Sequence, residues 1–184
     1  MAWWLGAAWF AFLAAFYVSH RRVRATVGGQ PENRVRRERS SDGGMALQFV
    51  GVALVLFVPG PWRAGMLLPG LLTAAASIAW LWHALRHLGR QWRVQAVVTD
   101  DHELITTGPY GVVRHPVYLA FMGMLMATAL MRGFPLVCIL AMAVFAVGTE
   151  IRVRAEERLL SAAFAARFAS YAGRTRWAFL PGLR

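Results

Sequence analysis

The sequence predicts an all-α integral membrane protein with five transmembrane helices and a C-terminal amphipathic helix at the membrane interface. Three observations carry this prediction. Of the 184 residues, 58% are hydrophobic, and only 16% are charged, which is less than a soluble domain of this length carries. The apolar residues gather in five runs. Most of the arginines fall between those runs. We treat residues 1–184 as a single membrane domain.

The five apolar runs are residues 2–18, about 45–58, 64 to about 88, 117–131 and 134 to about 149. The last two are shorter than the roughly 20 residues that a span needs. We expect them to lengthen into residues 111–115 and 150–154. The tight Arg132–Pro135 connection predicts that they form a helical hairpin.

The remaining segments are polar or amphipathic. Residues 30–44 predict a loop, which either contacts anionic headgroups or is simply solvated. The apolar residues of 155–172 have a spacing that predicts an amphipathic helix at the cytoplasmic interface: Leu159, Leu160, Ala163, Phe164 and Phe168, with Tyr171 continuing the face.

The arginine distribution predicts the orientation of the chain. Residues 21–39 carry seven arginines, residues 86–114 carry four and the tail from Arg152 carries seven, whereas the two other turns carry only Arg63 and Arg132. Five spans place eighteen arginines on one side and two on the other. By the positive-inside rule the N-terminus is outside and the C-terminus is cytoplasmic. The richness in Gly and Ala and the use of Arg in place of Lys suggest a bacterium of high genomic GC content, so we expect the protein in a bacterial inner membrane.

Several function classes lack support in the sequence. The net charge of +11 is spread between apolar runs rather than over one soluble face, which argues against nucleic-acid binding. The single cysteine, Cys138, excludes an intrachain disulfide and reads as a small buried apolar residue. The chain has no HExxH motif, no dinucleotide or P-loop glycine pattern and no nucleophile elbow. We therefore predict no metal centre.

Two polar clusters are expected to meet at the cytoplasmic end. The first is residues 107–118, a turn-rich segment with the pattern GPYxxxRHPxY, and the second is Arg152 with Glu156 and Glu157. Arg152 and Glu156 are four residues apart, so they share a face if the helix is continuous. A membrane protein that keeps such residues at the ends of its spans is usually holding something polar.

These residues resemble the isoprenylcysteine carboxyl methyltransferase family and its phospholipid methyltransferase-like relatives. The resemblance covers roughly residues 88–181. It implies a membrane enzyme that uses S-adenosylmethionine, with Arg152 and Glu156 as catalytic residues and Arg152 on the acceptor side. It also implies cofactor contacts from the following residues: Gln95, His102, Glu103, Leu104, Ile105, Gly108, Tyr110, His115, Pro116, Val117, Tyr118 and Glu156. In this chain Ala120, Ala165 and Phe168 replace residues that are often Gly, Gly and Tyr in the family.

The resemblance leaves the methyl acceptor open. It implies a lipophilic acceptor with a carboxylate, phenol, thiol or amine, and an isoprenylated cysteine is the family's namesake. We expect residues 89–184 to hold the cofactor and the chemistry, and residues 1–88 to shape the acceptor site. Two alternative functions remain open: an NADPH-dependent isoprenoid or sterol-type reductase, and a non-catalytic membrane scaffold.

Overall fold

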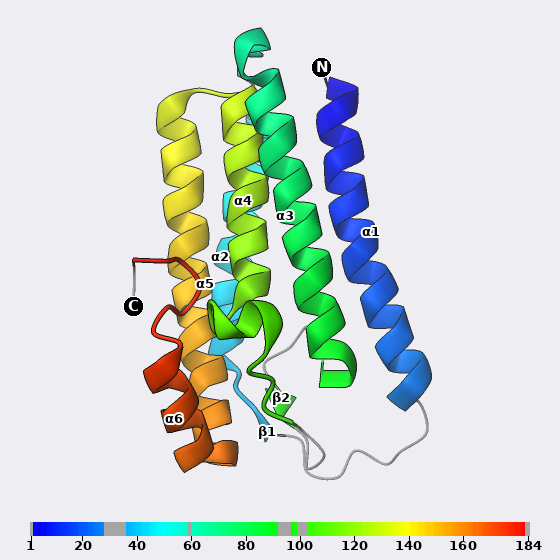
Figure 1. Ribbon diagram of the computed structural model, residues 1–184. Helices are drawn as coiled ribbons and strands as arrows, with labels where there is room; N and C mark the ends of the chain where they lie inside the picture. The colour runs from blue at the N-terminus through cyan, green and yellow to red at the C-terminus, as the bar shows by residue number, and fades with distance from the viewer. Residues whose placement is uncertain (1, 28–35, 59, 92–96, 99–102, 183–184) are drawn as a thin grey trace.

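The structure is a computed structural model that describes residues 2–27, 36–58, 60–91, 97–98 and 103–182. Most of this part is helical, and five long helices run side by side as a bundle (Figure 1). The helices are α1 (Ala2–Val27), α2 (Ser40–Phe57), α3 (Leu67–Leu88), α4 (Pro116–Met131), α5 (Pro135–Phe164) and α6 (Ala166–Arg174). Short 3-10 turns cover Ala64–Met66, Gly89–Gln91 and Gly108–Gly111, and β1 (Arg36–Arg37) pairs antiparallel with β2 (Val97–Val98).

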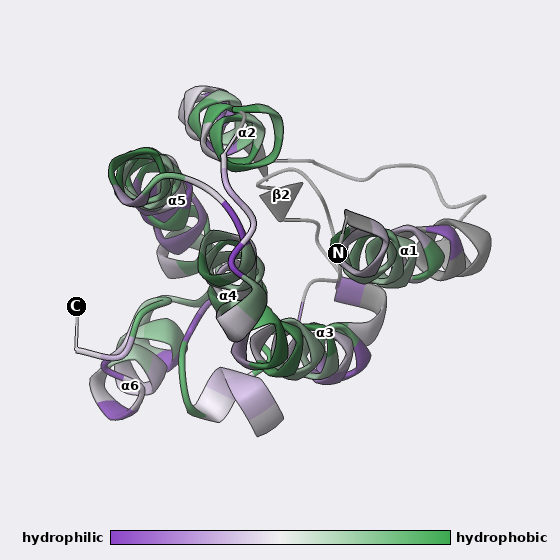
Figure 2. Cartoon of the chain, turned by 90° about the horizontal axis from the view of Figure 1, so that it is seen from above, coloured by the Kyte–Doolittle hydropathy of each residue, from purple (hydrophilic) through white to green (hydrophobic). Residues whose placement is uncertain are grey.

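Within the bundle the helices pair unequally. The most extensive contacts join α2 to α5 and α3 to α4, while α1 packs chiefly on α3. Seen from above, α4 lies between the α2–α5 pair and α3, and α1 is outermost beside α3 (Figure 2). The core between them includes Phe12, Leu81, Met124, Leu125 and Phe145, all of which are almost fully buried.

Small residues bring α2 and α5 into backbone contact. A Cβ atom on Gly44 would lie 2.5 Å from the carbonyl oxygen of Gly148, and one on Gly51 would lie 2.7 Å from that of Ala141. Such close approach is how membrane helices associate when apolar burial alone provides little drive. We refer to Gly44, Gly51 and Gly148 as the glycine seam. It fixes the register of α2 against α5 around the site described below.

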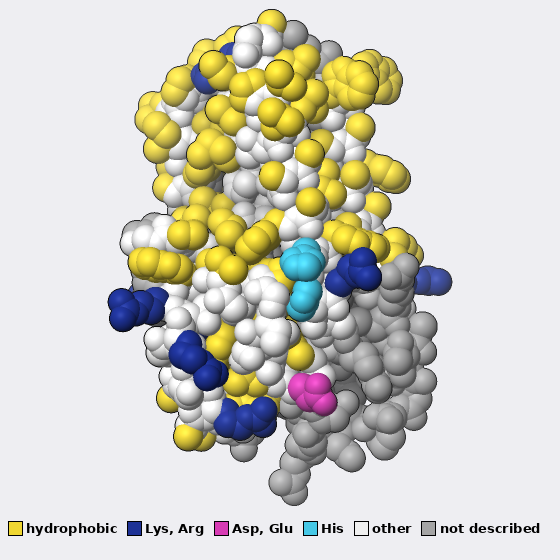
Figure 3. Space-filling view, viewed as in Figure 1, with side chains coloured by type: hydrophobic (Ala, Val, Ile, Leu, Met, Phe, Trp, Pro, Cys, Tyr) yellow, Lys and Arg dark blue, Asp and Glu magenta, His cyan; other side chains and the backbone are white. Residues whose placement is uncertain are grey.

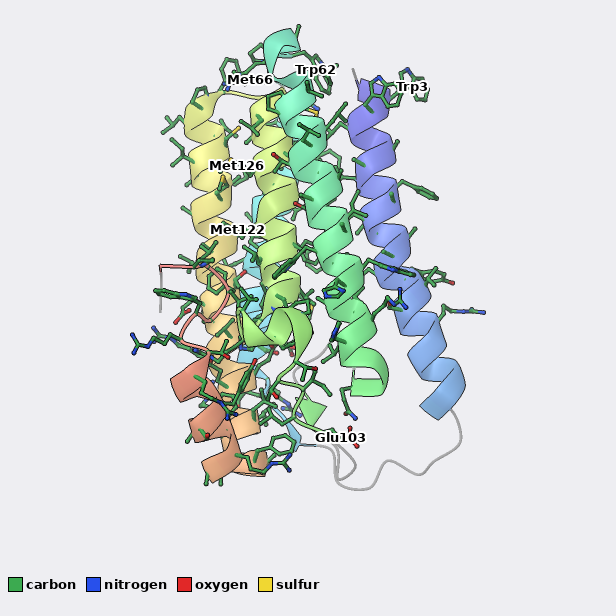
Figure 4. All side chains as sticks on the ribbon, viewed as in Figure 1. Trp3, Trp62, Met66, Glu103, Met122 and Met126 are labelled. Atoms are coloured by element: carbon green, nitrogen blue, oxygen red, sulfur yellow. The ribbon has the colours of Figure 1, made fainter. Side chains whose placement is uncertain are left out.

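The two connections at the other end of the bundle are bonded to each other. The Arg63 guanidinium donates to the Gly133 carbonyl at 2.9 Å, the Gly133 amide donates to the Pro61 carbonyl at 3.1 Å, and the Arg132 guanidinium lies 5.5 Å over the Trp62 ring. Trp62 lies at this end and Glu103 at the opposite end (Figure 4). The helical hairpin predicted at Arg132–Pro135 is confirmed, with α4 ending at Met131 and α5 starting at Pro135.

The protein is a membrane protein with an apolar outer surface. Within the described residues α2, the Ala64–Leu88 segment and α5 are long and apolar enough to span a bilayer, and Trp3–Ser19 and α4 are apolar but shorter. Large apolar side chains point outward, for example Phe49 (68% exposed) and Leu136 (77% exposed). In Figure 3 apolar side chains cover the upper part of the molecule, and most of the visible arginine lies at the lower end. This pattern suits a lipid-facing surface with one polar end.

Three sequence expectations about element bounds were wrong. Residues 40–44 belong to α2 rather than to a loop, because Gly44 allows the first turn of α2 to pack directly on α5. Residues 111–115 do not extend α4: a separate 3-10 turn ends at Gly111, and Pro116 begins the helix, where its missing N–H costs no hydrogen bond.

The third error concerns the end of α5. This helix is continuous to Phe164, since nothing in residues 150–164 breaks it, so residues 155–172 are not one interfacial helix. The break falls at Ala165, whose φ is 43°, and α6 is a separate nine-residue helix. The predicted common face of Arg152 and Glu156 is thereby confirmed.

Candidate active site

A cavity of about 530 Å³ lies between α1, α2, α4, α5 and the loop that precedes α4. A volume of this size is within the range of small-molecule sites, which is about 300–1,000 Å³. Most of its wall is apolar and comes from the first half of the chain and from α4 and α5: Trp9, Leu13, Phe16, Met45, Phe49, Val52, Leu56, Phe121 and Phe145. A group of polar side chains lines the remainder: Gln48, Gln91, Glu103, Tyr110, Arg114, His115, Tyr118, Arg152, Glu156 and Tyr171.

His115 lies between the paired glutamates of α5. Its Nδ1 is 3.1 Å from Glu156 Oε2, and its Nε2 is 3.5 Å from Glu157 Oε1. The residue is buried, and Nε2 has no hydrogen-bond partner of good geometry. Burial alone would lower the pKa of His115, but its interactions with the two carboxylates outweigh burial and raise the pKa above the ordinary value of 6.5. The His115 imidazolium is therefore stabilised next to the cavity.

Tyr118 joins Arg152 to Glu156. Its hydroxyl donates to Glu156 Oε1 and accepts a hydrogen bond from Arg152 Nε at 2.9 Å. The Arg152 guanidinium also lies 5.6 Å over the Tyr118 ring. Arg152 is 6% exposed and Tyr118 is 9% exposed. Charged and polar groups this well enclosed are held in one arrangement, as a reaction site requires.

Arg114 ties the C-terminal segment to the site. Its Nε donates to Glu157 Oε1 at 2.7 Å, and its Nη1 donates to the carbonyls of Thr175 and Arg176, each at 2.7 Å. The backbone amide of Arg114 also donates to the Trp177 carbonyl at 2.9 Å. These hydrogen bonds hold residues 175–178 against the loop before α4 and orient Glu157 toward His115.

The turn at Gly108–Gly111 positions Tyr110. The Tyr171 hydroxyl of α6 donates to the Tyr110 carbonyl at 2.7 Å, and burial raises the pKa of both phenols, so both stay neutral. Gly108 has a φ of 59°, and a Cβ there would collide with the His87 ring. Gly108 is thus needed for the backbone turn and for close packing on α3.

The structure brings most of the sequence-predicted site residues to one cavity. The residues that line it are Glu103, Leu104, Ile105, Tyr110, His115, Pro116, Val117, Tyr118, Arg152 and Glu156. Gly108 does not line the cavity and packs on His87 instead. Gln95 and His102 lie outside the described residues. Cofactor contact by any of these residues remains a prediction.

Several residues that line the cavity were not predicted from the sequence: some lie in the first half of the chain, and one lies in the motif before α4. Arg114 directly precedes His115 in the GPYxxxRHPxY pattern, and this position could have indicated a role in the site. Gln48 is a lone amide in an otherwise apolar run, which is an unusual residue to place in a membrane span. Trp9 and Phe16 carried no signal, because aromatic residues in an apolar helix are usually packing residues.

The prediction of no metal centre did not weigh one histidine pair. His83 and His87 have HxxxH spacing on α3, and their ring centroids are 4.4 Å apart. His87 Nδ1 donates to the His83 carbonyl at 3.0 Å. Within the described ranges, no group of three or more His, Cys, Asp or Glu side chains could hold a metal ion.

Comparison with known proteins places this fold and cavity in one family. Residues 70–162 match the model of the isoprenylcysteine carboxyl methyltransferase (ICMT) family, a match that covers half of the chain. The chain belongs to this family. The match spans α3, α4, both polar clusters and nearly all of α5, which are the elements that form the polar end of the cavity.

Three relatives extend the comparison. The chain is 33% identical to the cobalt-zinc-cadmium resistance protein CzcN of Cupriavidus metallidurans over 83% of its own length and 68% of that protein. It is 36% identical to the nickel-cobalt-cadmium resistance protein NccN of Alcaligenes xylosoxydans xylosoxydans over 73% of its own length and 62% of that protein. It is 26% identical to the protein YpbQ of Bacillus subtilis, over 82% and 96% of the two chains.

Proposed function

We propose that the protein transfers a methyl group from S-adenosylmethionine to a lipophilic acceptor. Membership of the ICMT family supports a membrane methyltransferase in general terms. The observation that carries the proposal for this chain is the division of its cavity. Buried polar groups gather at one end, and aromatic and aliphatic side chains from α1, α2, α4 and α5 line the rest. One cavity thus offers a polar site for a charged cofactor beside an apolar site for a lipid.

The polar end fits the chemistry of S-adenosylmethionine. The buried His115 Nε2 lacks a hydrogen-bond partner, and Glu156 offers carboxylate oxygens to an ammonium group or to ribose hydroxyls. Leu104, Ile105 and Val117 give apolar surface against which adenine can pack. When bound, this cofactor supplies a methyl group on a sulfonium that is already activated for transfer.

The protein's own residues would then align and shield the reactants. Arg152 is always charged, and its planar guanidinium can orient a carboxylate or phenolate oxygen. Tyr118 and Glu156 hold that guanidinium in place. The apolar walls exclude water, which strengthens each polar contact in the site. Alignment and shielding are the main contributions an enzyme can make when the electrophile is already activated.

We further propose that residues 1–88 shape the acceptor site. Trp9, Phe16, Phe49 and Val52 of α1 and α2 all line the apolar part of the cavity. An isoprenylated cysteine carboxylate, another lipid carboxylate, a phenol, a thiol or an amine is compatible with such a site.

For the membrane arrangement we propose five spans, with the N-terminus outside and the C-terminus cytoplasmic, in a bacterial inner membrane. The two turns with one arginine each lie at the same end of the bundle, and the polar end of the cavity lies at the other, which supports this arrangement. Methyl transfer would then occur at the cytoplasmic interface.

The direct test is to incubate the purified protein and methyl-labelled S-adenosylmethionine with lipid extracts and to identify labelled products by mass spectrometry. We expect a labelled lipophilic product that needs Arg152. Thermal unfolding distinguishes a methyltransferase from an NADPH-dependent reductase, because a ligand that binds the native state raises the unfolding midpoint of the protein. We expect S-adenosylmethionine to raise the midpoint and NADPH to leave it unchanged. The reverse result would favour a reductase, and no response to either would favour a scaffold.

A second candidate role, contribution to divalent-metal resistance, is supported only by the names of two relatives. Growth of a deletion strain in cobalt, zinc and cadmium tests it. Complementation with wild-type protein and with Arg152→Lys then shows whether any resistance depends on methyl transfer. If Arg152→Lys fails to complement, metal resistance depends on methyl transfer. Equal growth of all strains would rule out a role in metal resistance.

A further inference from the structure

Gln48 is a polar side chain in the apolar part of the bundle that the site chemistry above does not use. It lies in the middle of α2, is 9% exposed and lines the cavity. Its Nε2 donates to Thr149 Oγ1 of α5 at 2.9 Å. An uncharged amide inside a membrane protein is costly without hydrogen bonds and is usually retained for a function.

The glycine seam fixes where this amide lies. Gly44 packs on Gly148 and on the Arg152 side chain, and Gly51 packs on Ala141 and Phe145. Gln48 lies between these two contacts on α2. It is therefore one helical turn deeper in the bundle than Arg152, on the same α2–α5 boundary. Glu156, Arg152 and Gln48 therefore lie at successively deeper positions along the cavity, and apolar side chains such as Val52 and Phe145 lie beyond them.

The hydrogen-bonding capacity of Gln48 is only partly used. The side chain makes a single hydrogen bond within the described part of the chain, through one of its two Nε2 protons. Within the described residues its Oε1 atom makes no hydrogen bond, and the side chain lines the cavity. One N–H and one carbonyl oxygen therefore remain for a bound molecule. A buried amide left with unmet hydrogen bonds discriminates strongly in favour of a ligand that satisfies it.

We propose that Gln48, oriented by Thr149, binds the polar head of the methyl acceptor and determines acceptor specificity. The inference rests on the proposed methyltransferase function. It selects one chemical class of acceptor, in which a single long apolar chain ends in an oxygen-bearing head, either a carboxylate or a phenol. The head oxygen accepts from Arg152 and from Gln48 Nε2. Thiols fit less well, because sulfur is a weak hydrogen-bond acceptor. The chain lies among Phe16, Phe49 and Val52.

The test compares Gln48→Met with wild type, because methionine keeps the length of the side chain and removes its hydrogen bonds. Three probes serve as acceptors: N-acetyl-S-farnesylcysteine, 4-dodecylphenol and dodecanethiol. We expect Gln48→Met to raise the KM for each methylated oxygen acceptor about tenfold or more, with the KM for S-adenosylmethionine within about twofold of wild type. Transfer to the thiol should change less than about threefold, so the preference for oxygen over sulfur falls.

Two further variants separate recognition from folding. Thr149→Val keeps Gln48 but removes its hydrogen-bond partner, so it should raise the same acceptor KM by a smaller factor, and the double variant should resemble Gln48→Met alone. Val50→Ala is the matched control, because Val50 is exposed on the same helix and does not line the cavity. If Gln48→Met does not fold, Gln48→Leu replaces it with the same expectation, because leucine also removes the hydrogen bonds of the side chain.

The outcomes are distinguishable. Wild-type protein that methylates none of the three probes overturns the proposed function together with this inference. Wild-type transfer to the thiol alone, or transfer with an unchanged oxygen-to-sulfur preference in Gln48→Met, overturns the role of Gln48 and leaves methyl transfer in place. A parallel rise in the KM values for both acceptor and S-adenosylmethionine would show that Gln48 only maintains packing, and would also overturn it.

Discussion

Arg152 and Tyr118 form one unit: Arg152 Nε donates to the Tyr118 hydroxyl at 2.9 Å, and the guanidinium lies over the phenol ring. The direct distance from Arg152 Nη2 to Glu156 Oε1 is longer, at 3.7 Å. The i,i+4 pair in the sequence is therefore not a simple surface salt bridge. The tyrosine from α4 sets the orientation of the arginine from α5, so the polar end of the cavity depends on how these two helices pack.

Replacing Arg152 by lysine should separate turnover from cofactor binding. Lysine keeps the charge but loses the planar fork and the Nε donor to Tyr118. We expect turnover to fall by about 100-fold, as when a donor to the reacting oxygen is removed, while S-adenosylmethionine affinity stays near wild type. Steady-state kinetics and calorimetry measure the two quantities. Arg154→Lys is the control, since Arg154 is exposed and forms an ion pair with Glu150 on the surface of α5. If S-adenosylmethionine affinity falls as much as turnover, Arg152 binds the cofactor and not the acceptor.

Removing His115 or Glu156 should weaken the cofactor instead. Both residues line the polar end of the cavity, where His115 is buried and the Glu156 side chain is 22% exposed. We expect His115→Ala and Glu156→Ala each to reduce S-adenosylmethionine binding by about 1–3 kcal/mol, measured by calorimetry. Val112→Ala, an exposed position outside the cavity, should have no effect. Unchanged affinity in both site variants would refute their assignment to the cofactor.

The stability of the ligand-free protein should depend on pH through His115. Its folded-state pKa is raised, so its contribution to stability is fully present below the ordinary pKa of 6.5 and is lost as pH rises through the folded-state pKa. We expect the thermal midpoint of the wild-type protein to decrease as the pH rises above about 6.5, and His115→Gln to remove that part of the dependence. A wild-type profile that the substitution leaves unaltered would show that the His115 charge is not stabilised by Glu156 and Glu157.

Much of the candidate site could be predicted from the sequence because its residues are local to two segments. The spacing from Tyr110 to Tyr118 places them on one turn and one helix start, and Arg152 and Glu156 share a face on any continuous helix. Their meeting required only that the two segments leave the bundle at the same end, which the arginine distribution already indicated.

The errors have other physical origins, and most of them depend on tertiary contacts. The start of α2 at Ser40 depends on Gly44 meeting the backbone of α5, and no local pattern reveals that partner. Gln48 became a candidate only when the glycine seam placed it one turn from Arg152. The prediction divided the long α5 after Arg154 because the change from apolar to charged residues was taken to mark a separate interfacial helix, although a change in polarity does not break a helix.

Ala165 offers a test of local strain. Its φ of 43° lies where a side chain is disfavoured, and it is the only non-glycine residue of the described ranges with positive φ. We expect Ala165→Gly to stabilise the protein by about 1 kcal/mol, because glycine adopts this conformation without steric cost. The neighbouring Ala166→Gly, inside the first turn of α6, should instead destabilise by about 0.5–1 kcal/mol. Denaturant or thermal unfolding in detergent compares the two, and destabilisation by both would show that Ala165 is not strained.

The five-span arrangement makes a prediction about two turns that are far apart in sequence. Arg63 donates to the Gly133 carbonyl next to Arg132, so the connections after α2 and after α4 lie together at the end of the bundle away from α6. Eighteen of the twenty arginines belong to the other side in this arrangement, which makes that side cytoplasmic. Reporter fusions placed after Arg63 and after Arg132 should therefore both report the outside, and a fusion after Arg176 should report the cytoplasm. A cytoplasmic signal from either turn would break the five-span arrangement. If the two turns gave opposite signals, their paired contacts in the fold would also be wrong.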